Sequence, residues 1–182
     1  MDDRNVLTHL FLSHPKSIVM LRAWHHVIVI DATYKTNKYD MPWVEIVGMT
    51  LVGLNFVNSS TIVYDEMKES YQWLLTHLQH LLGPIVPDVF VSDKAGGLVG
   101  TVGVMFPSST HILCLWHIDR NVRAKCLAEV RTTHCGIDAA KPTVDHIMVS
   151  WQRAVYALIE EDMDTTLDNF RRSWGVQGVF GS

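Results

Sequence analysis

Two strand-like runs that each end in an aspartate constrain this sequence most strongly. Residues 27–30 (Val-Ile-Val-Ile) lead into Asp31, and residues 89–92 (Val-Phe-Val-Ser) lead into Asp93. A carboxylate at the end of a buried strand is costly unless a positive partner meets it. Either aspartate alone would fit an ordinary turn or helix cap, where Asp is common. Together they suggest a shared divalent metal ion.

Composition indicates a globular protein. The 182 residues are 48% hydrophobic and 19% charged, which is ordinary for one domain with a core. No apolar run approaches the roughly 18 residues of a membrane span, and the acidic start of the chain is unlike a signal peptide. Three irregularly spaced cysteines fit a reducing compartment. We therefore expect an intracellular protein.

The hydrophobic pattern predicts an α/β domain. Strands are expected over residues 27–31, 44–52, 56–64, 88–92 and 110–115. Helices are expected over residues 66–82, 116–131, 143–161 and 163–174, with a loop over 132–142 and an acidic junction at 160–162. The first strands should form an antiparallel three-strand start, and a β-α-β crossover should bring Asp93 beside Asp31.

The segment after Asp93 is rich in glycine. Residues 95–104 have apolar positions at helical spacing but contain four glycines, each costing about 1 kcal/mol relative to alanine in a helix. A weak or distorted helix is expected here. The spacing matches neither a P-loop nor a dinucleotide-binding fingerprint.

Four segments then point to a known family. They are residues 29–39 (Val-Ile-Asp-Ala-Thr-Tyr-Lys-Thr-Asn-Lys-Tyr) with Met41-Pro42, residues 69–74 (Glu-Ser-Tyr-Gln-Trp-Leu), residues 91–93 (Val-Ser-Asp), and Phe106-Pro107 leading to residues 114–122 (Cys-Leu-Trp-His-Ile-Asp-Arg-Asn-Val). In this order and at these separations they resemble the transposases of Mutator-like elements, called MULE transposases. That family belongs to the ribonuclease H-like group of DDE transposases and integrases.

The resemblance implies a fold and a reaction. The expected fold is a ribonuclease H-like mixed sheet, antiparallel at the start and then parallel, flanked by helices and followed by a helical C-terminal segment. The implied reaction is metal-dependent cleavage and transfer of DNA strands in transposition. Asp31 and Asp93 match the first two catalytic carboxylates, which would hold Mg²⁺ or Mn²⁺.

A Cys-x-x-His signature of the family matches Cys114 and His117. A zinc site would need two more ligands, for which Cys126, His134 and Cys135 are the nearest candidates, at a spacing that matches no standard finger. We do not expect zinc. A buried thiol and a hydrogen-bonded histidine at a strand-to-helix junction are the favoured interpretation.

The sequence departs from the family at the third carboxylate. In the family this glutamate follows an inserted helical segment, in a stretch resembling Thr-x-Asn-x-x-Glu-x-x-Asn, and no such stretch occurs here. We therefore expect residues 1–131 to form an incomplete core and residues 132–182 to begin the helical insertion, truncated before the glutamate. The expectation that follows is a catalytically impaired remnant.

DNA is the partner that the resemblance implies, in the nucleus or elsewhere inside the cell. A net charge of −4 argues that this segment alone would bind DNA weakly. Plausible backbone contacts are Lys35, Lys38, Arg120 and Arg123. The aromatic residues Tyr34, Trp73 and Trp116 are expected in the core or at its rim.

Two other functions remain open from the sequence. One is a non-enzymatic, DNA-associated regulator derived from a transposase. The other is a stand-alone metal-dependent nuclease that uses the same aspartates together with Glu66 or Glu69.

Overall fold

The computed structural model describes residues 6–133, 137–157 and 160–174. The chain divides into two compact units, Met1–Cys114 and Leu115–Ser182, which are described separately. None of the described helices is long and apolar enough to span a membrane.

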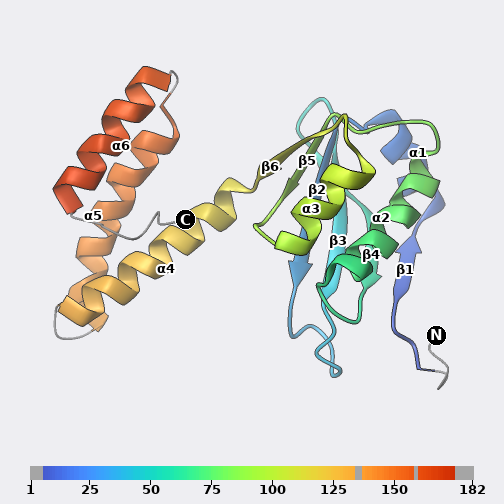
Figure 1. Ribbon diagram of the computed structural model, residues 1–182, viewed down its shortest axis with the longest axis horizontal. Helices are drawn as coiled ribbons and strands as arrows, with labels where there is room; N and C mark the ends of the chain where they lie inside the picture. Colours follow the sequence, from blue (N-terminus) through green and yellow to red (C-terminus); the bar gives the residue numbers. More distant parts are fainter. Residues whose placement is uncertain (1–5, 134–136, 158–159, 175–182) are drawn as a thin grey trace. The chain divides into compact units, whose positions relative to one another are not determined.

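The first unit contains a mixed sheet of six strands in the order β1-β4-β3-β2-β5-β6 (Figure 1). The strands are β1 (Leu10–Ser13), β2 (Val27–Thr33), β3 (Trp43–Met49), β4 (Asn55–Ile62), β5 (Val89–Ser92) and β6 (Thr110–Leu113). The pairs β1–β4, β4–β3 and β3–β2 are antiparallel. Strand β5 pairs parallel with both β2 and β6. This is the antiparallel start followed by parallel strands that the sequence predicts.

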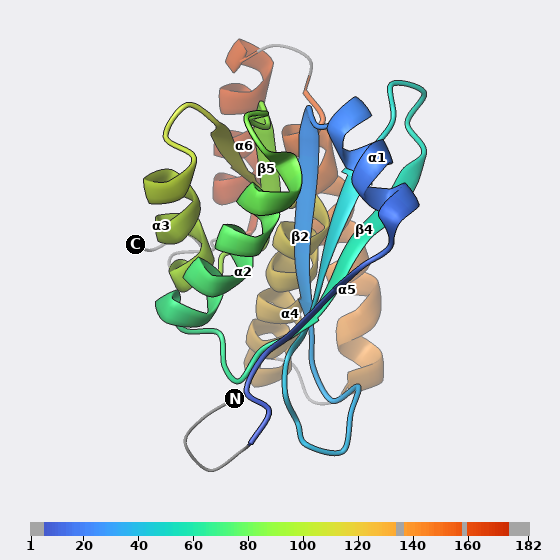
Figure 2. The same cartoon turned by 90° about the vertical axis from the view of Figure 1, so that its right-hand side faces the viewer.

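Helices cover one face of this sheet. They are α1 (Pro15–Ala23), α2 (Lys68–Leu82) and α3 (Gly96–Met105), and Figure 2 shows α1 and α2 in front of the strands. The core between the helices and the sheet includes Leu21, Ile28, Ile30, Val44, Ile46, Tyr71, Leu74, Leu75, Leu78, Phe90, Leu98 and Val102. In β2 only Ile28 and Ile30 are buried, because side chains alternate between the two faces of a strand.

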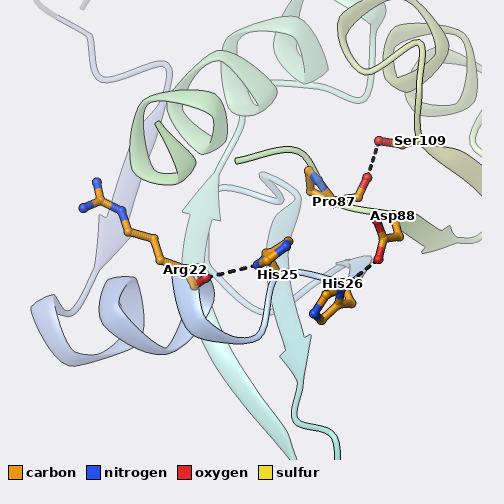
Figure 3. A network of polar contacts seen from close by, with 6 residues as sticks. All are labelled: Arg22, His25, His26, Pro87, Asp88 and Ser109. Atoms are coloured by element: carbon orange, nitrogen blue, oxygen red, sulfur yellow. Dashed lines mark hydrogen bonds and ion pairs between the residues drawn. The ribbon is translucent and has the colours of Figure 1, made fainter. Parts of the chain in front are cut away.

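A hydrogen-bond network fixes the amino ends of β2 and β5 (Figure 3). The carbonyl of His26 accepts bonds from the backbone N–H groups of Asp88 and Val89, and its ring Nδ1 lies 2.7 Å from Asp88 Oδ2. The Ser109 hydroxyl donates to the Pro87 carbonyl at 2.6 Å, which ties in the start of β6. These contacts hold the register of the three parallel strands.

The second unit consists of three helices, α4 (Leu115–Thr133), α5 (Ile137–Val155) and α6 (Glu160–Trp174). Its core contains Val122, Cys126, Val144, Ile147, Met148, Trp151 and Phe170. The indole N–H of Trp151 donates a 2.6 Å hydrogen bond to Asp119, so α4 and α5 are joined by a polar contact as well as by apolar packing.

The structure adds one element pair that the sequence reading missed. Strand β1 and helix α1 precede β2, and the helix begins with a detectable signal. Its cap residue His14 accepts a hydrogen bond from the Lys16 N–H, and Pro15 stands in the first helical turn, where proline is favoured.

Two expectations for the C-terminal segment were wrong. The loop expected over 132–142 is helical at 132–133 and from Ile137 onward, whereas residues 134–136 lie outside the described part. The interior Pro142 costs one helical hydrogen bond, but the apolar stripe that follows it packs in the core. The acidic junction at 160–162 is instead the first turn of α6, where negative charge is favoured by the helix dipole.

Other boundaries differ modestly. The glycine-rich segment forms one continuous ten-residue helix, α3. The expected strand over 110–115 ends at Leu113, and α4 begins at Leu115. The division between a core and an insertion at residues 131 and 132 remains a prediction, since the boundary of the structural units at 114 and 115 does not test it.

Candidate metal and nucleic-acid site

Asp31 lies near the carboxyl end of β2, on the sheet face opposite to α1, α2 and α3. Its neighbour Ile30 is buried in the core, so the alternation of the strand turns Asp31 to the other face, where it is half-buried. Asp31 also stands directly opposite Glu45 of β3 in the antiparallel register. Opposed residues share a face, so two carboxylates lie side by side there.

Asp93 is the first residue after β5. Ser92 is paired in parallel with Ile30, so Asp31 and Asp93 each follow a register-paired residue on adjacent strands. Adjacent strands are about 4.8 Å apart. The Oδ1 atom of Asp93 accepts a 3.2 Å hydrogen bond from the Ala95 N–H, which shapes the turn into α3. The backbone therefore brings the two aspartates to one edge of the sheet.

Ser92 and His111 form hydrogen bonds next to the turn at Asp93. Ser92 is 2% exposed, and its hydroxyl donates a 2.8 Å hydrogen bond to the Asp93 carbonyl. His111 Nε2 lies 2.9 Å from the same hydroxyl. Burial lowers the pKa of His111, so its ring is favoured in the neutral form.

Glu66 is the carboxylate whose electrostatics respond to Asp93. Its pKa is raised, chiefly by burial and further by the negative charge of Asp93, and a hydrogen bond from Tyr71 opposes the shift. The Tyr71 hydroxyl donates to Glu66 Oε1 at 2.9 Å. Burial and the same two carboxylates raise the pKa of Tyr71 well above its ordinary value, so this hydroxyl keeps its proton.

The donor set suits a hard divalent cation. Asp31 and Asp93 offer carboxylate oxygens, the ligands that Mg²⁺ and Mn²⁺ prefer, and such ions retain water in their remaining positions. Within residues 6–133, 137–157 and 160–174, no three His, Cys, Asp or Glu side chains are grouped as a ready-made metal site. The two aspartates therefore fit part of a divalent site rather than a closed cage.

The signature residues Cys114 and His117 stand at the junction of β6 and α4. Both are half-buried, and the Cys114 N–H donates a 2.6 Å hydrogen bond to the Ser92 carbonyl. Cys114 and Cys126 are free thiols. His134 and Cys135, two of the zinc candidates, lie outside the described residues, so the expectation about zinc stays a prediction.

The four basic residues proposed as DNA contacts are exposed. Lys35 and Lys38 lie in the loop between β2 and β3, where the Lys38 ammonium is 4.8 Å from the centre of the Tyr39 ring. Arg120 and Arg123 lie on α4, and Arg123 forms a 2.5 Å ion pair with Asp145. Arg123 is thus partly neutralised within the protein.

The expectation that the aromatic residues pack in the core or at its rim was wrong for two of the three. Tyr34 is 54% exposed and Trp116 is 61% exposed, while Trp73 does pack against the core of the first unit. Sequence reasoning also did not single out Glu45. Its position opposite Asp31 follows only from the hairpin register.

The strand order and the paired strand-end aspartates define a ribonuclease H-like protein. The sequence profile of the MULE transposase domain matches residues 27–121, which is just over half of the chain. The chain therefore belongs to the MULE transposase domain family.

Several curated proteins are similar in sequence to part of this chain. Protein FAR1-RELATED SEQUENCE 5 of Arabidopsis thaliana is 22% identical over 117 residues, covering 64% of this chain and 15% of that protein. Protein FAR-RED IMPAIRED RESPONSE 1 of the same plant is 25% identical over 112 residues, covering 62% and 14%. The PKS-NRPS hybrid synthetase cheA of Chaetomium globosum is 29% identical over 102 residues, covering 54% and 2%. The chain thus spans a small part of each relative.

Solved structures to which this chain is similar include retroviral integrase cores. The HTLV-2 integrase catalytic core, solved in complex with magnesium, covers 74% of this chain and 88% of its own, with 14% identity and a TM-score of 0.34. The BIV integrase core covers 82% and 98%, with 13% identity and a TM-score of 0.34.

Proposed function

We propose that this chain provides the metal-binding half of a transposase active site, in which Asp31 and Asp93 hold Mg²⁺ or Mn²⁺ for DNA strand cleavage and transfer. The observation that carries the proposal is the parallel register of β2 and β5. Because Ile30 is paired with Ser92, the following aspartates stand at the ends of adjacent strands. Membership of the MULE transposase domain family supports the reaction class.

Four residues of the chain would have distinct roles at this site. Asp31, held on a central strand, and Asp93, held by its turn into α3, would bind the metal through their carboxylates. When bound, the metal supplies activation of a water or a DNA 3′-hydroxyl and stabilisation of the leaving oxygen. Ser92 and His111 would fix the backbone that carries Asp93.

Titration of Mn²⁺ into the purified chain tests this proposal. Isothermal titration calorimetry of the wild type should show binding that disappears in an Asp31→Asn, Asp93→Asn double variant. An Asp164→Asn variant is a matched control, because Asp164 is an exposed aspartate on α6, in the other unit. No binding by the folded wild type would contradict the proposal. DNA binding that then survived in the double variant would favour a non-enzymatic, DNA-associated regulator.

A stand-alone nuclease is a second candidate, because Glu66 responds to the charge of Asp93. In that case Glu66 would join the two aspartates, and this chain alone would cleave DNA with Mn²⁺. Glu66→Gln would then abolish cleavage, whereas the exposed Glu69→Gln would leave cleavage unchanged. Absence of any metal-dependent cleavage by the wild type would exclude this candidate.

A further inference from the structure

The loop between β2 and β3 presents two kinds of side chain that suit a nucleic-acid strand. Tyr34 and Tyr39 are 54% and 70% exposed, and both Lys35 and Lys38 are exposed. Two aromatic rings and two positive charges are therefore presented within one short loop. Aromatic rings stack on unpaired bases, and lysines neutralise phosphates.

The shape of this loop is held by Asn37. Its Oδ1 accepts hydrogen bonds from the N–H groups of Tyr39 at 3.1 Å and Met41 at 3.3 Å. Its Nδ2 donates to the Met41 carbonyl at 2.6 Å. Lys35 and Asp40 adopt left-handed backbone conformations, with φ of 57° and 54°. Non-glycine residues seldom take this conformation, and such positions cluster at binding sites.

Lys38 and Tyr39 of this loop also contact each other. The Lys38 ammonium lies 4.8 Å from the centre of the Tyr39 ring, within the range of a cation–π contact. This contact restrains both side chains at the surface. A strand that approached the loop would therefore meet a ring and a positive charge in a largely preformed arrangement.

The loop is placed at the edge of the sheet that carries the two aspartates. It follows Thr33, two residues after Asp31, and β5 ends in the same direction because it runs parallel to β2. Figure 2 shows the loop, in light blue, projecting beyond the ends of β2 and β3. A DNA strand lying along this edge would contact both the loop and the carboxylates.

We propose that residues 33–42 form a binding surface for an unpaired DNA strand, with Tyr34 and Tyr39 stacking on bases and Lys35 and Lys38 contacting phosphates. The inference rests on the proposed function, which names DNA as the substrate. An unpaired strand is the occupant because the faces of its bases are accessible, whereas duplex bases are stacked on each other.

The test measures fluorescence anisotropy of a labelled single-stranded oligonucleotide and of its duplex, in EDTA at low salt. The variants are Tyr34→Ala with Tyr39→Ala, the same pair changed to Phe, and Lys35→Gln with Lys38→Gln. The controls are Tyr156→Ala, an exposed tyrosine in the other unit, and Lys16→Gln on α1. Circular dichroism checks that each variant is folded.

The wild type should bind the single strand more tightly than the duplex. The double alanine variant should lose affinity by roughly 10-fold or more, and the Phe pair should retain it within about 2-fold, because Phe stacks as Tyr does. The lysine variant should reduce the slope of log K against log salt by about 0.7 per phosphate contact. Equal binding of duplex and single strand, or an alanine pair that binds like the wild type, would overturn the inference.

The outcome is separable from the metal proposal. EDTA removes divalent ions, so this binding does not depend on Asp31 or Asp93 holding a metal. A chain that binds no Mn²⁺ but shows these losses would refute the proposed function and keep the loop surface. If the chain binds Mn²⁺ but the loop variants lose no affinity for DNA, the proposed function stands and the loop surface is refuted.

Discussion

His111 Nε2 lies 2.9 Å from the hydroxyl oxygen of Ser92, the residue before Asp93. The Ser92 hydroxyl carries one proton and donates it to the Asp93 carbonyl at 2.8 Å. The imidazole must therefore act as the donor to Ser92, which assigns the Nε2–H tautomer. A side chain from β6 thus reaches, through one buried hydroxyl, the peptide that carries a proposed metal ligand.

Replacing Ser92 with alanine should remove both hydrogen bonds and leave the half-buried His111 ring without its partner. The free energy of unfolding should fall by about 1–3 kcal/mol, as expected when a buried polar group loses its partner. Urea denaturation measures the change. Ser92→Thr keeps the hydroxyl and should lose less. If Ser92→Ala is as stable as the wild type, these bonds do not contribute to stability.

The Mn²⁺ affinity of His111 variants tests whether the hydrogen bond to Ser92 affects the proposed metal site. Loss of residues that orient a ligand typically weakens metal binding by about 10- to 100-fold. His111→Phe should show such a loss, whereas His111→Gln, which retains a donor near the position of Nε2, should recover most of it. Thr110→Ala, on the same strand, is the control. Equal losses in the Phe and Gln variants would contradict a role for the hydrogen bond.

Gly97 allows α3 to approach the start of α2. A Cβ atom built on Gly97 would lie 2.9 Å from the Glu66 carbonyl oxygen and 3.3 Å from both the Lys68 nitrogen and the Tyr71 ring. Two of these neighbours are backbone atoms, which cannot move aside cheaply. Gly97→Ala should therefore lower the free energy of unfolding by about 1–3 kcal/mol, measured by urea denaturation.

Gly100 and Gly103 on the same helix are the matched controls. Apart from the adjacent backbone of α3 itself, a Cβ at either position would meet no atom within 4 Å. Alanine there should stabilise the protein by up to about 1 kcal/mol, because alanine favours the helical backbone. If Gly97→Ala were as stable as Gly100→Ala, the packing of α3 against α2 would be looser than the structure shows.

The sequence predicted the part of the fold that follows from local patterns. Alternating β-branched residues located β2, β3 and β4, and the apolar stripe ending at Gly83 located α2. The β-α-β order then implied that Asp31 and Asp93 would meet, and their backbone positions agree with this. The metal-binding role of the two aspartates stays a prediction.

Other features depend on contacts between distant segments and could not be read from spacing. Glu45 stands beside Asp31 only because of the hairpin register. His111 reaches Ser92 only because β6 pairs with β5. The exposure of Tyr34 and Trp116 depends on which surfaces other elements leave uncovered. Sequence patterns therefore do not reveal whether an aromatic side chain of this kind is buried or exposed.

Tyr71 should stabilise the protein through its hydrogen bond to Glu66. Tyr71 is 1% exposed, and its hydroxyl donates to the carboxylate at 2.9 Å. Tyr71→Phe should lower the free energy of unfolding by about 1.5 kcal/mol, the lower value for a bond to a charged group, because Glu66 is partly exposed. The substitution should also raise the pKa of Glu66, because the hydrogen bond from Tyr71 lowers that pKa in the wild type. NMR titration of the Glu66 carboxyl measures the second effect.

Glu66→Gln provides the control for the Tyr71 prediction. Its amide oxygen can still accept the bond from Tyr71 while the negative charge is removed. In this background Tyr71→Phe should cost less than it does in the wild type. An equal cost in both backgrounds would show that the charge of Glu66 does not strengthen the bond.

His9 should make the protein sensitive to acid. Its ring Nε2 lies 3.1 Å from the Ser70 hydroxyl, which itself donates to Asp65. Burial lowers the pKa of His9 below its ordinary value of 6.5, although the charge of Asp65 opposes the shift. The folded state therefore favours the neutral ring. The stability that results is fully present above the pKa that His9 has in the unfolded chain. It is lost as the pH falls through the lower pKa that His9 has in the folded protein.

His9→Gln should consequently flatten the dependence of stability on pH. Urea denaturation from about pH 7.5 to about pH 5 should show a smaller loss of unfolding free energy in the variant than in the wild type, because Gln cannot be protonated in this range. His80→Gln, an exposed histidine on α2, should retain the wild-type slope. A slope in His9→Gln equal to that of the wild type would show that protonation of another group governs acid sensitivity.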